Sequence, residues 1–134
     1  MPVSKPPTLR VVAAILRDDQ QRVLIAQRPP GKPQAGYWEF PGGKLAAGES
    51  EQSALVRELR EELGIEVRAS RALTALTHDY GDRVVQLAVW VVDRFDGWPR
   101  GIEGQPLKWV AVSQLTEQGL LPADQPIVDM LDRG

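Results

Sequence analysis

The apolar residues of the N-terminal half fall into short runs separated by turn-forming residues. Leu9 to Leu16 is nearly continuously apolar, and a second apolar run extends from Arg22 to Gln27. Residues 18–21 between them are polar, so the pattern predicts two strands joined by a turn. Residues 29–36 contain three prolines and two glycines and predict a loop.

The next segment is short and aromatic, and it leads to the clearest helix in the sequence. Residues 37–40 end at Pro41-Gly42-Gly43, where glycine permits backbone geometry closed to other residues, so a tight turn is expected. Ser50 can cap a helix N-terminus, apolar residues then recur at helical spacing through Leu63, and Gly64 suits the C-terminal cap. A helix between the two caps is therefore predicted.

The C-terminal half is expected to be mainly extended, with one helix at its end. Segments rich in valine and leucine predict strands, and a stretch with three glycines and two prolines predicts a loop. The predicted elements are strands at residues 65–67, 73–77, 83–92 and 107–112, a turn at 79–82, a loop at 93–106 and a terminal helix at 126–132.

Length and composition indicate one globular domain. The chain has 134 residues, of which 43% are hydrophobic and 25% charged, which suits a single domain over residues 9–134 after a flexible lead at residues 1–8. The absence of cysteine excludes disulfides, a thiolate nucleophile and cysteine zinc sites. The formal charge of -2 argues against polymeric nucleic acid as a partner. Because no apolar run is long enough for a membrane span, a cytoplasmic protein is expected. We also expect a monomer.

Acidic residues gather on one face of the predicted helix. Glu58, Glu61 and Glu62 fall within about 100° of arc at helical periodicity, beside the apolar stripe. A solvated acidic face is the ordinary interpretation of such residues, but Glu58 and Glu62 repel each other at the i, i+4 spacing. A hard cation with oxygen ligands explains the clustering. The pattern predicts a site for Mg²⁺, with Mn²⁺ as a substitute.

The segment from Gly43 to Ile65 carries a family signature. Gly43 is followed by Glu49, then by Arg57-Glu58-Leu59, Glu61-Glu62 and Gly64-Ile65, and this series resembles the Nudix box with every fixed position filled. The resemblance implies an α/β protein with the Nudix fold, in which a mixed β-sheet is sandwiched between helices. It also implies an enzyme that hydrolyses the phosphate chain of a nucleotide.

The same resemblance assigns roles to residues of the box. It implies that water attacks a phosphorus atom, that Mg²⁺ neutralises the phosphate oxygens and that a carboxylate takes the proton. Glu58 is the expected base or water-orienting metal ligand. Glu61, Glu62 and the Gly42 carbonyl are the expected further metal ligands, and Arg57 is expected to orient the carboxylates.

Outside the box, the chain is similar to the MutT branch of the family, which converts 8-oxo-dGTP to 8-oxo-dGMP and pyrophosphate. The similarity covers residues 38–44 and 101–109. It implies a further metal-site carboxylate at Glu103. It also implies a nucleotide-binding surface formed by Arg28, Glu39, Phe40, Pro41, Gly42, Lys44 and Tyr80.

One position departs from the MutT branch. Asp124 stands where that branch has asparagine, and an ionised aspartate can only accept hydrogen bonds. The CTP pyrophosphohydrolase branch of the family carries Pro-Ala-Asp at this place, as this chain does at residues 122–124. Asp124 is therefore expected either to contact the base of the nucleotide or to cap the terminal helix.

Three functions remain open at this point. Hydrolysis of 8-oxo-dGTP, which removes the oxidised nucleotide before a polymerase incorporates it, is the leading hypothesis. Hydrolysis of CTP, or of an oxidised or methylated pyrimidine nucleotide, is the alternative. A non-catalytic nucleotide-binding module is the third hypothesis, and the intact set of Glu58, Glu61 and Glu62 argues against it because such a module has no need of these carboxylates.

Overall fold

The computed structural model describes residues 7–133. The elements within this range are the strands β1 (Thr8–Leu16), β2 (Val23–Gln27), β3 (Trp38–Glu39), β4 (Gly42–Lys44), β5 (Glu66–Asp79), β6 (Val84–Asp96) and β7 (Leu107–Val110), the helices α1 (Glu51–Leu63) and α2 (Gln125–Arg133), and the 3-10 helices η1 (Val112–Glu117) and η2 (Pro122–Asp124).

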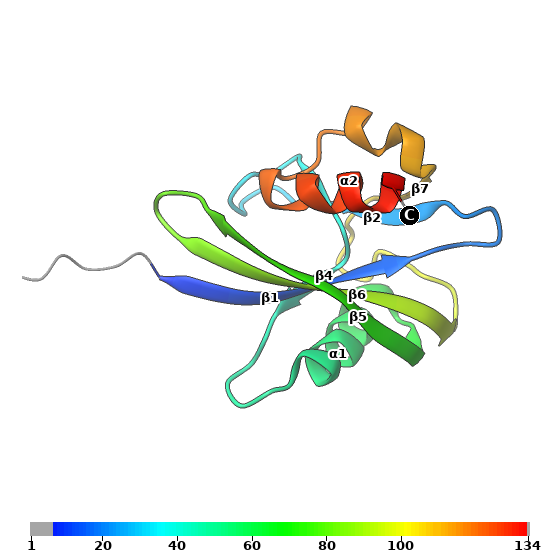
Figure 1. Cartoon of the computed structure of the whole chain (residues 1–134). Helices are drawn as coiled ribbons and strands as arrows, with labels where there is room; N and C mark the ends of the chain where they lie inside the picture. The colour runs from blue at the N-terminus through cyan, green and yellow to red at the C-terminus, as the bar shows by residue number, and fades with distance from the viewer. Residues whose placement is uncertain (1–6, 134) are drawn as a thin grey trace, which may run out of the picture.

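The strands form two sheets that lie between the two helices. A four-stranded sheet has the order β4-β1-β6-β5, and a three-stranded sheet has the order β3-β2-β7. The pairing of β1 with β6 is parallel and the other pairings are antiparallel. Figure 1 shows α1 on one side of the strands and α2 on the other. The predicted α/β fold with mixed strand directions between helices is confirmed, with the strands divided between two sheets.

The second half of strand β1, residues 12–16, is buried on both of its faces. Ala13 and Ile15 belong to a core cluster that includes residues of α2, whereas Val12 and Leu16 belong to a cluster that includes residues of α1. Successive side chains of a strand point to opposite faces, so both faces must be apolar when both are covered. This explains why the segment is continuously hydrophobic rather than alternating.

The caps predicted for α1 are present. Ser50 lies just before the helix, and its side chain accepts a hydrogen bond of 3.1 Å from the backbone N–H of Ser53. Gly64 has a φ of 70°, and its N–H donates to the Arg60 carbonyl. Glycine adopts this left-handed backbone conformation at little cost in free energy, because it has no Cβ atom. The helix therefore begins and ends where the sequence predicts.

Several predicted boundaries are wrong, mostly because strand pairing extends beyond the apolar runs. The two extended segments expected at residues 65–67 and 73–77 are one strand, β5, and β6 continues to Asp96. β5 lies at the edge of its sheet and has register shifts, so it can include residues 68–71, of which Arg68 and Arg71 are exposed and the other two half-buried. The tight turn expected at Pro41-Gly42-Gly43 is wrong, because both glycines belong to strand β4, which pairs with β1.

The chain ends also differ slightly from expectation. Residues 1–6 of the predicted flexible lead lie outside the described part, but Thr8 is already in β1 and the Pro7 carbonyl accepts from the Val84 N–H. The last strand ends at Val110, two residues earlier than predicted, and a 3-10 helix follows. Within residues 7–133, no helix is long and apolar enough to cross a membrane.

Candidate active site

The Glu58 side chain of helix α1 approaches the backbone of strand β4 closely at Gly43. A Cβ atom at Gly43 would overlap the carboxyl group of Glu58. A Cβ atom at the neighbouring Gly42 would instead overlap the backbone carbonyl of Val12 in β1. Gly43 therefore leaves space for the Glu58 carboxylate, and Gly42 allows β4 to pair with β1.

Arg57 connects the carboxylates of the box. Its Nε and Nη2 atoms donate to the two carboxylate oxygens of Glu49 at 2.7 and 2.8 Å. Its Nη1 atom donates to Glu58 at 3.0 Å and to Glu61 at 3.2 Å, and Nη2 also donates to the Lys44 carbonyl at 3.0 Å. The hydrogen bonds from Arg57 and from the Ala46 N–H lower the pKa of Glu49 to about 2. Glu49 thus anchors the arginine, which leaves one guanidinium nitrogen for Glu58 and Glu61.

Glu58 and Glu62 form a half-buried acidic pair. Glu62 accepts a hydrogen bond of 3.3 Å from the Gly42 N–H. Burial, followed by the charge of Glu58, raises the pKa of Glu62 to about 8, and the charge of Glu103 contributes. Burial also raises the pKa of Glu58, although Arg57 opposes the shift. Both carboxylates are therefore poorly solvated, and the charge of Glu58 disfavours the ionised form of Glu62.

The acidic pair fits a divalent cation. Carboxylate oxygens are the ligands that Mg²⁺ and Mn²⁺ prefer, and a cation would offset the repulsion between Glu58 and Glu62. Glu61 is exposed on the same helix, and Glu103 is exposed in the loop before β7. Within residues 7–133, no three His, Cys, Asp or Glu side chains lie close enough together to hold a metal as they stand. A cation at this pair therefore requires Glu61, Glu103, water or substrate oxygens to complete its coordination.

Asp124 lies on the α2 side of the sheets and is almost completely buried, with 4% of its surface exposed. Its Oδ2 atom accepts a hydrogen bond of 3.2 Å from the Phe40 N–H, a contact between segments 84 residues apart. Next to it, the Tyr80 hydroxyl accepts from the Ala123 N–H at 3.1 Å. Asp124 therefore connects η2 to the segment after β3, and Oδ1 is the oxygen left for a ligand.

Arg28 and Glu39 form an ion pair beside this carboxylate. Arg28 Nη1 donates to both Glu39 oxygens at 3.1 and 3.2 Å, and its Nε atom donates to the Pro33 carbonyl at 2.8 Å. Burial raises the pKa of Glu39, and the charge of Arg28 opposes the shift. Burial raises the pKa of Asp124, and the charge of Glu39 contributes to the shift. The sequence-predicted residues Arg28, Glu39 and Asp124 are thus brought together.

The remaining predicted substrate residues have different surroundings. The Phe40 side chain is 3% exposed and belongs to the core cluster that includes α2. Pro41 is buried, and its carbonyl accepts from the Ala14 N–H at 2.7 Å. Lys44 is exposed at the end of β4. Phe40 and Pro41 can therefore face a ligand only through backbone atoms, whereas the ammonium group of Lys44 is free to move.

Two residues near these groups were missed by sequence reasoning. The Arg83 guanidinium lies over the Tyr80 ring, 4.5 Å from its centroid, and donates to the Gln34 side chain at 3.2 Å. Gln105 contacts the C-terminal turn of α1 through its side chain. Residues in turns and loops follow no periodic pattern. The only signal in the sequence is that Arg83 lies close to Tyr80 and Gln105 close to Glu103 along the chain.

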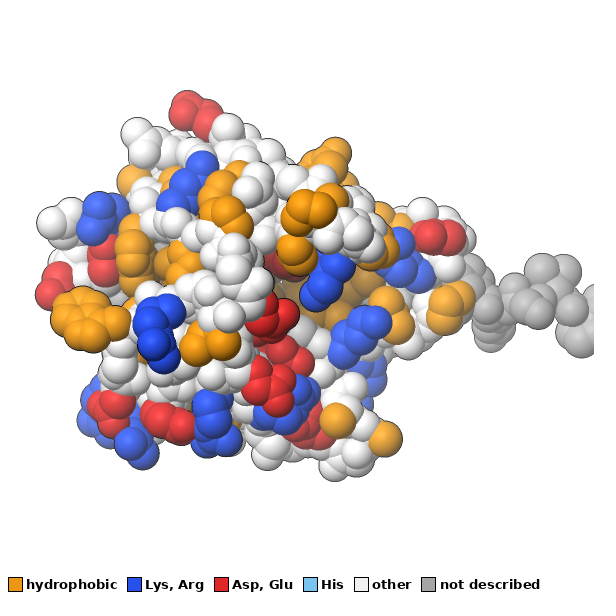
Figure 2. All heavy atoms as spheres, turned by 180° about the vertical axis from the view of Figure 1, so that it is seen from behind, with side chains coloured by type: hydrophobic (Ala, Val, Ile, Leu, Met, Phe, Trp, Pro, Cys, Tyr) orange, Lys and Arg blue, Asp and Glu red, His pale blue; other side chains and the backbone are white. Residues whose placement is uncertain are grey.

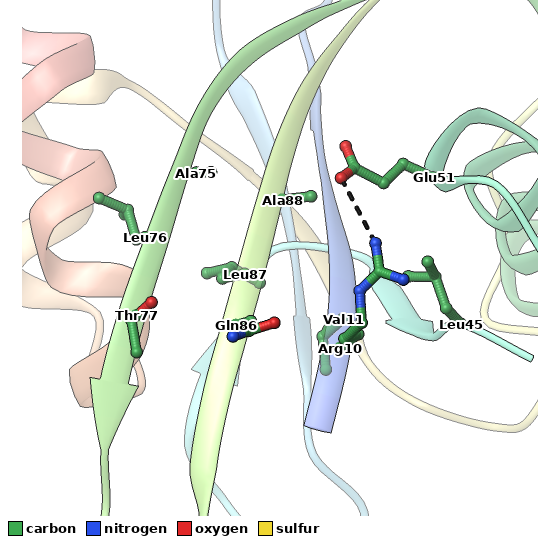
Figure 3. Close-up of a pocket in the computed structure, with 10 residues that line it drawn as sticks. All are labelled: Arg10, Val11, Leu45, Glu51, Ala75, Leu76, Thr77, Gln86, Leu87 and Ala88. Atoms are coloured by element: carbon green, nitrogen blue, oxygen red, sulfur yellow. Dashed lines mark ion pairs between the residues drawn. The ribbon is translucent and has the colours of Figure 1, made fainter. Parts of the chain in front are cut away.

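The surface around the acidic residues is hollowed. Figure 2 shows a face of the molecule on which Asp and Glu side chains gather at a central hollow, with Lys and Arg side chains beside it. A different hollow lies on the sheet formed by β1, β5 and β6, where Arg10 and Glu51 form an ion pair at its margin (Figure 3). The lining of that second hollow contains neither Glu58 nor Asp124.

Asp124 is expected to make the stability of the protein depend on pH. Burial raises its pKa from an ordinary value of 3.8 to about 7. The folded protein therefore holds this proton up to about pH 7, whereas the unfolded chain loses it near pH 4, so the stabilisation is present at low pH and is lost as the pH rises through 7. Relative to Asp124→Asn, the unsubstituted protein should lose on the order of 2–3 kcal/mol of unfolding free energy between pH 5 and pH 8, nearly all of it below pH 7.

Urea unfolding of both proteins at the two pH values measures this difference. Glu39, Glu58 and Glu62 titrate in both proteins, so their contributions largely cancel in the comparison. Asp129→Asn, which removes an exposed carboxylate of α2, is the matched control and should leave the pH dependence unchanged. Parallel curves for the unsubstituted protein and Asp124→Asn would show that Asp124 is ionised throughout.

The fold and the site together define a class of protein: an α/β domain whose capped helix presents an arginine-linked acidic pair suited to a divalent cation. The NUDIX domain family model matches residues 11–130. The chain therefore belongs to the Nudix hydrolase family, as the box indicated.

Relatives of both branches are similar over nearly their whole length. The CTP pyrophosphohydrolase of Escherichia coli K12 is 41% identical over 121 residues, which are 90% of this chain and 89% of that protein. The 8-oxo-dGTP diphosphatase of the same organism is 35% identical over 125 residues, which are 93% of this chain and 97% of that protein. A solved structure from work on MutT of Aliivibrio salmonicida and Vibrio cholerae has a TM-score of 0.80 at 38% identity, with 92% of this chain and 95% of that chain covered.

Proposed function

We propose that the chain is a Mg²⁺-dependent nucleoside triphosphate pyrophosphohydrolase that converts 8-oxo-dGTP and water to 8-oxo-dGMP and pyrophosphate. The observation that carries this proposal is the acidic pair of Glu58 and Glu62, half-buried and connected through Arg57 to Glu49. A solvated acidic face would leave these carboxylates exposed and apart. A binding module that only recognises a nucleotide does not require them.

Each residue of the box has a distinct task in the proposed reaction. Glu58 takes a proton from the attacking water, as a positioned carboxylate can. Glu62, with Glu61, Glu103 and the Gly42 carbonyl, would hold Mg²⁺, which supplies positive charge to the phosphate oxygens when bound. Arg57 fixes the direction of the Glu58 carboxylate, and Lys44 and Arg28 provide positive charge for the nucleotide.

A panel of nucleoside triphosphates tests the function. Oxidised and normal nucleotides are compared by kcat/KM, with pyrophosphate and nucleoside monophosphate quantified as products. We expect pyrophosphate from 8-oxo-dGTP in the presence of Mg²⁺ and no turnover in excess EDTA. Binding of nucleotides without pyrophosphate release would favour the module, and turnover that persists in EDTA would exclude the metal assignment.

The buried carboxyl of Asp124 supports a second candidate substrate, CTP. An ionised carboxylate accepts well from the exocyclic amine of cytosine. With 8-oxoguanine, an ionised carboxylate can accept a hydrogen bond from the N7 hydrogen. A hydrogen bond to O6, which is itself an acceptor, requires the protonated carboxyl group as donor. A pKa near 7 supplies both forms at neutral pH. We retain 8-oxo-dGTP as the main substrate because the residues around Glu103 and Trp109 resemble the MutT branch more closely.

Asp124→Asn is expected to shift this choice of base. An asparagine amide always offers a donor beside its acceptor, so it suits the O6 and N7 edge of 8-oxoguanine at every pH. The ratio of kcat/KM for 8-oxo-dGTP over CTP should rise about tenfold, the effect of one improved hydrogen bond. The measurement compares both substrates with both proteins. A constant ratio together with lower thermal stability would assign Asp124 a structural role only.

A further inference from the structure

The loop between β6 and β7 is fastened to the C-terminal turn of α1. The N–H groups of Arg100 and Ile102 donate to the carbonyls of Leu63 and Glu62 at 2.9 and 3.1 Å. These are carbonyls that the end of a helix leaves without intrahelical partners. A Cβ atom at Gly101 would overlap the Gln105 carbonyl, so the loop is also packed tightly against itself.

Gln105 joins both sides of this contact through one amide group. Its Nε2 atom donates to the Glu62 carbonyl at 3.1 Å, and its Oε1 atom accepts from the Glu103 N–H at 3.0 Å. An amide is among the few side chains that donate and accept at once in this way. The Gln105 side chain therefore fixes the backbone of Glu103 relative to the backbone of Glu62.

The position of Glu103 matters to the acidic pair. Glu103 is exposed on a loop, yet the Gln105 amide joins its N–H to the backbone carbonyl of Glu62, a member of the pair. A loop carboxylate that is free to move would spend most of its time in solvent, because like charges repel it from the pair. A fixed backbone reduces the conformational entropy that is lost when such a ligand is ordered.

We infer that Gln105 is a positioning residue for the metal site, which holds the Glu103 carboxylate within reach of the cation that Glu58 and Glu62 would bind. This inference rests on the metal site of the proposed function. Groups that orient a metal ligand through hydrogen bonds typically change metal affinity by 10- to 100-fold when they are removed. Gln105 acts here through the backbone of Glu103 and touches neither substrate nor metal.

Mn²⁺ binding in the absence of nucleotide tests the inference without turnover. Free Mn²⁺ is measured by electron paramagnetic resonance in a titration of the protein. We expect Gln105→Met, which keeps the length of the side chain and removes both hydrogen bonds, to raise the Kd for Mn²⁺ about tenfold. Gln118→Met is the matched control, since Gln118 also donates from Nε2 to a carbonyl, that of Gln114, within η1 and its C-cap; its Kd should be unchanged.

A double-mutant cycle separates positioning from general stability. If Gln105 acts through Glu103, then Glu103→Gln alone should weaken Mn²⁺ binding and Gln105→Met should add less than twofold in that background. A full tenfold effect in the Glu103→Gln background, or no effect of Gln105→Met beyond Gln118→Met, would overturn the inference. Should Gln105→Met fail to fold, Gln105→Asn, whose amide is one methylene too short to span both partners, replaces it with the same expectation.

The two proposals can fail separately. An unchanged Kd for Glu103→Gln would remove Glu103 from the metal site and overturn the inference about Gln105, while pyrophosphate release by the unsubstituted protein would still support the proposed function. Conversely, Mn²⁺ binding with the expected cycle but without hydrolysis of any nucleotide would uphold the positioning role and overturn the enzymatic proposal.

Discussion

Glu58→Gln is expected to lower kcat by roughly 100-fold or more while the protein stays folded. An amide of the same shape cannot take a proton from water, and a positioned general base usually contributes 10²- to 10⁴-fold. The same change removes the partly buried charge of Glu58, which disfavours ionisation of Glu62. Thermal stability without metal should therefore stay the same or rise.

Steady-state kinetics with 8-oxo-dGTP and thermal unfolding measure the two expectations. Glu117→Gln makes the same chemical change at an exposed position of η1 and should leave kcat within a factor of two. The proposed role of Glu58 requires loss of activity without loss of structure. A Glu58→Gln protein with kcat near that of the unsubstituted chain would remove Glu58 from the mechanism.

Gly43→Ala should lose activity, whereas Gly42→Ala should lose stability. The added methyl group at Gly43 overlaps the end of the Glu58 side chain, which can move away, and a displacement of about 1 Å in a catalytic group can cost about 100-fold in rate. The methyl group at Gly42 overlaps the Val12 carbonyl. That atom belongs to a central strand and cannot move without breaking the pairing of β1 with β4, so a loss of roughly 2 kcal/mol or more in unfolding free energy is expected.

Urea unfolding and kcat, measured for both alanine variants, separate the two effects. Combining Gly43→Ala with Glu58→Gln provides the control: once the carboxylate no longer acts as a base, moving it should cost little more, so the double variant should resemble Glu58→Gln alone. Equal losses of stability in Gly42→Ala and Gly43→Ala would mean that both glycines serve strand pairing only.

The helix and the acidic pair could be predicted from the sequence because their determinants are local. Ser50 and Gly64 mark the ends of α1, and the spacing of Glu58 and Glu62 puts both on one face. The contact between Asp124 and Phe40 joins segments 84 residues apart, and no periodic pattern specifies it. The same applies to Gln105, whose partners lie in a helix that ends 42 positions earlier at Leu63 and in its own loop.

Strand boundaries were the least predictable part of the fold. Residues 69–71 of β5 are polar or small and carry no strand pattern of their own, yet they pair with β6 because that long neighbour continues past them. Gly42 and Gly43 likewise look like a turn, and they are a strand only because β1 accepts them as partners. In both cases the partner strand overrides the local preference.

The burial of β1 on both faces has a consequence for how relatives of this chain can diverge. Glu58 belongs to α1, which packs on one core cluster, and Asp124 lies beside α2, which packs on the other. Alternating residues of β1 contribute to the two clusters separately. Substitutions that repack the α2 layer can therefore move Asp124 without displacing Glu58. Under the roles proposed for Asp124 and Glu58, one scaffold can therefore change the base it selects while its hydrolytic chemistry stays the same.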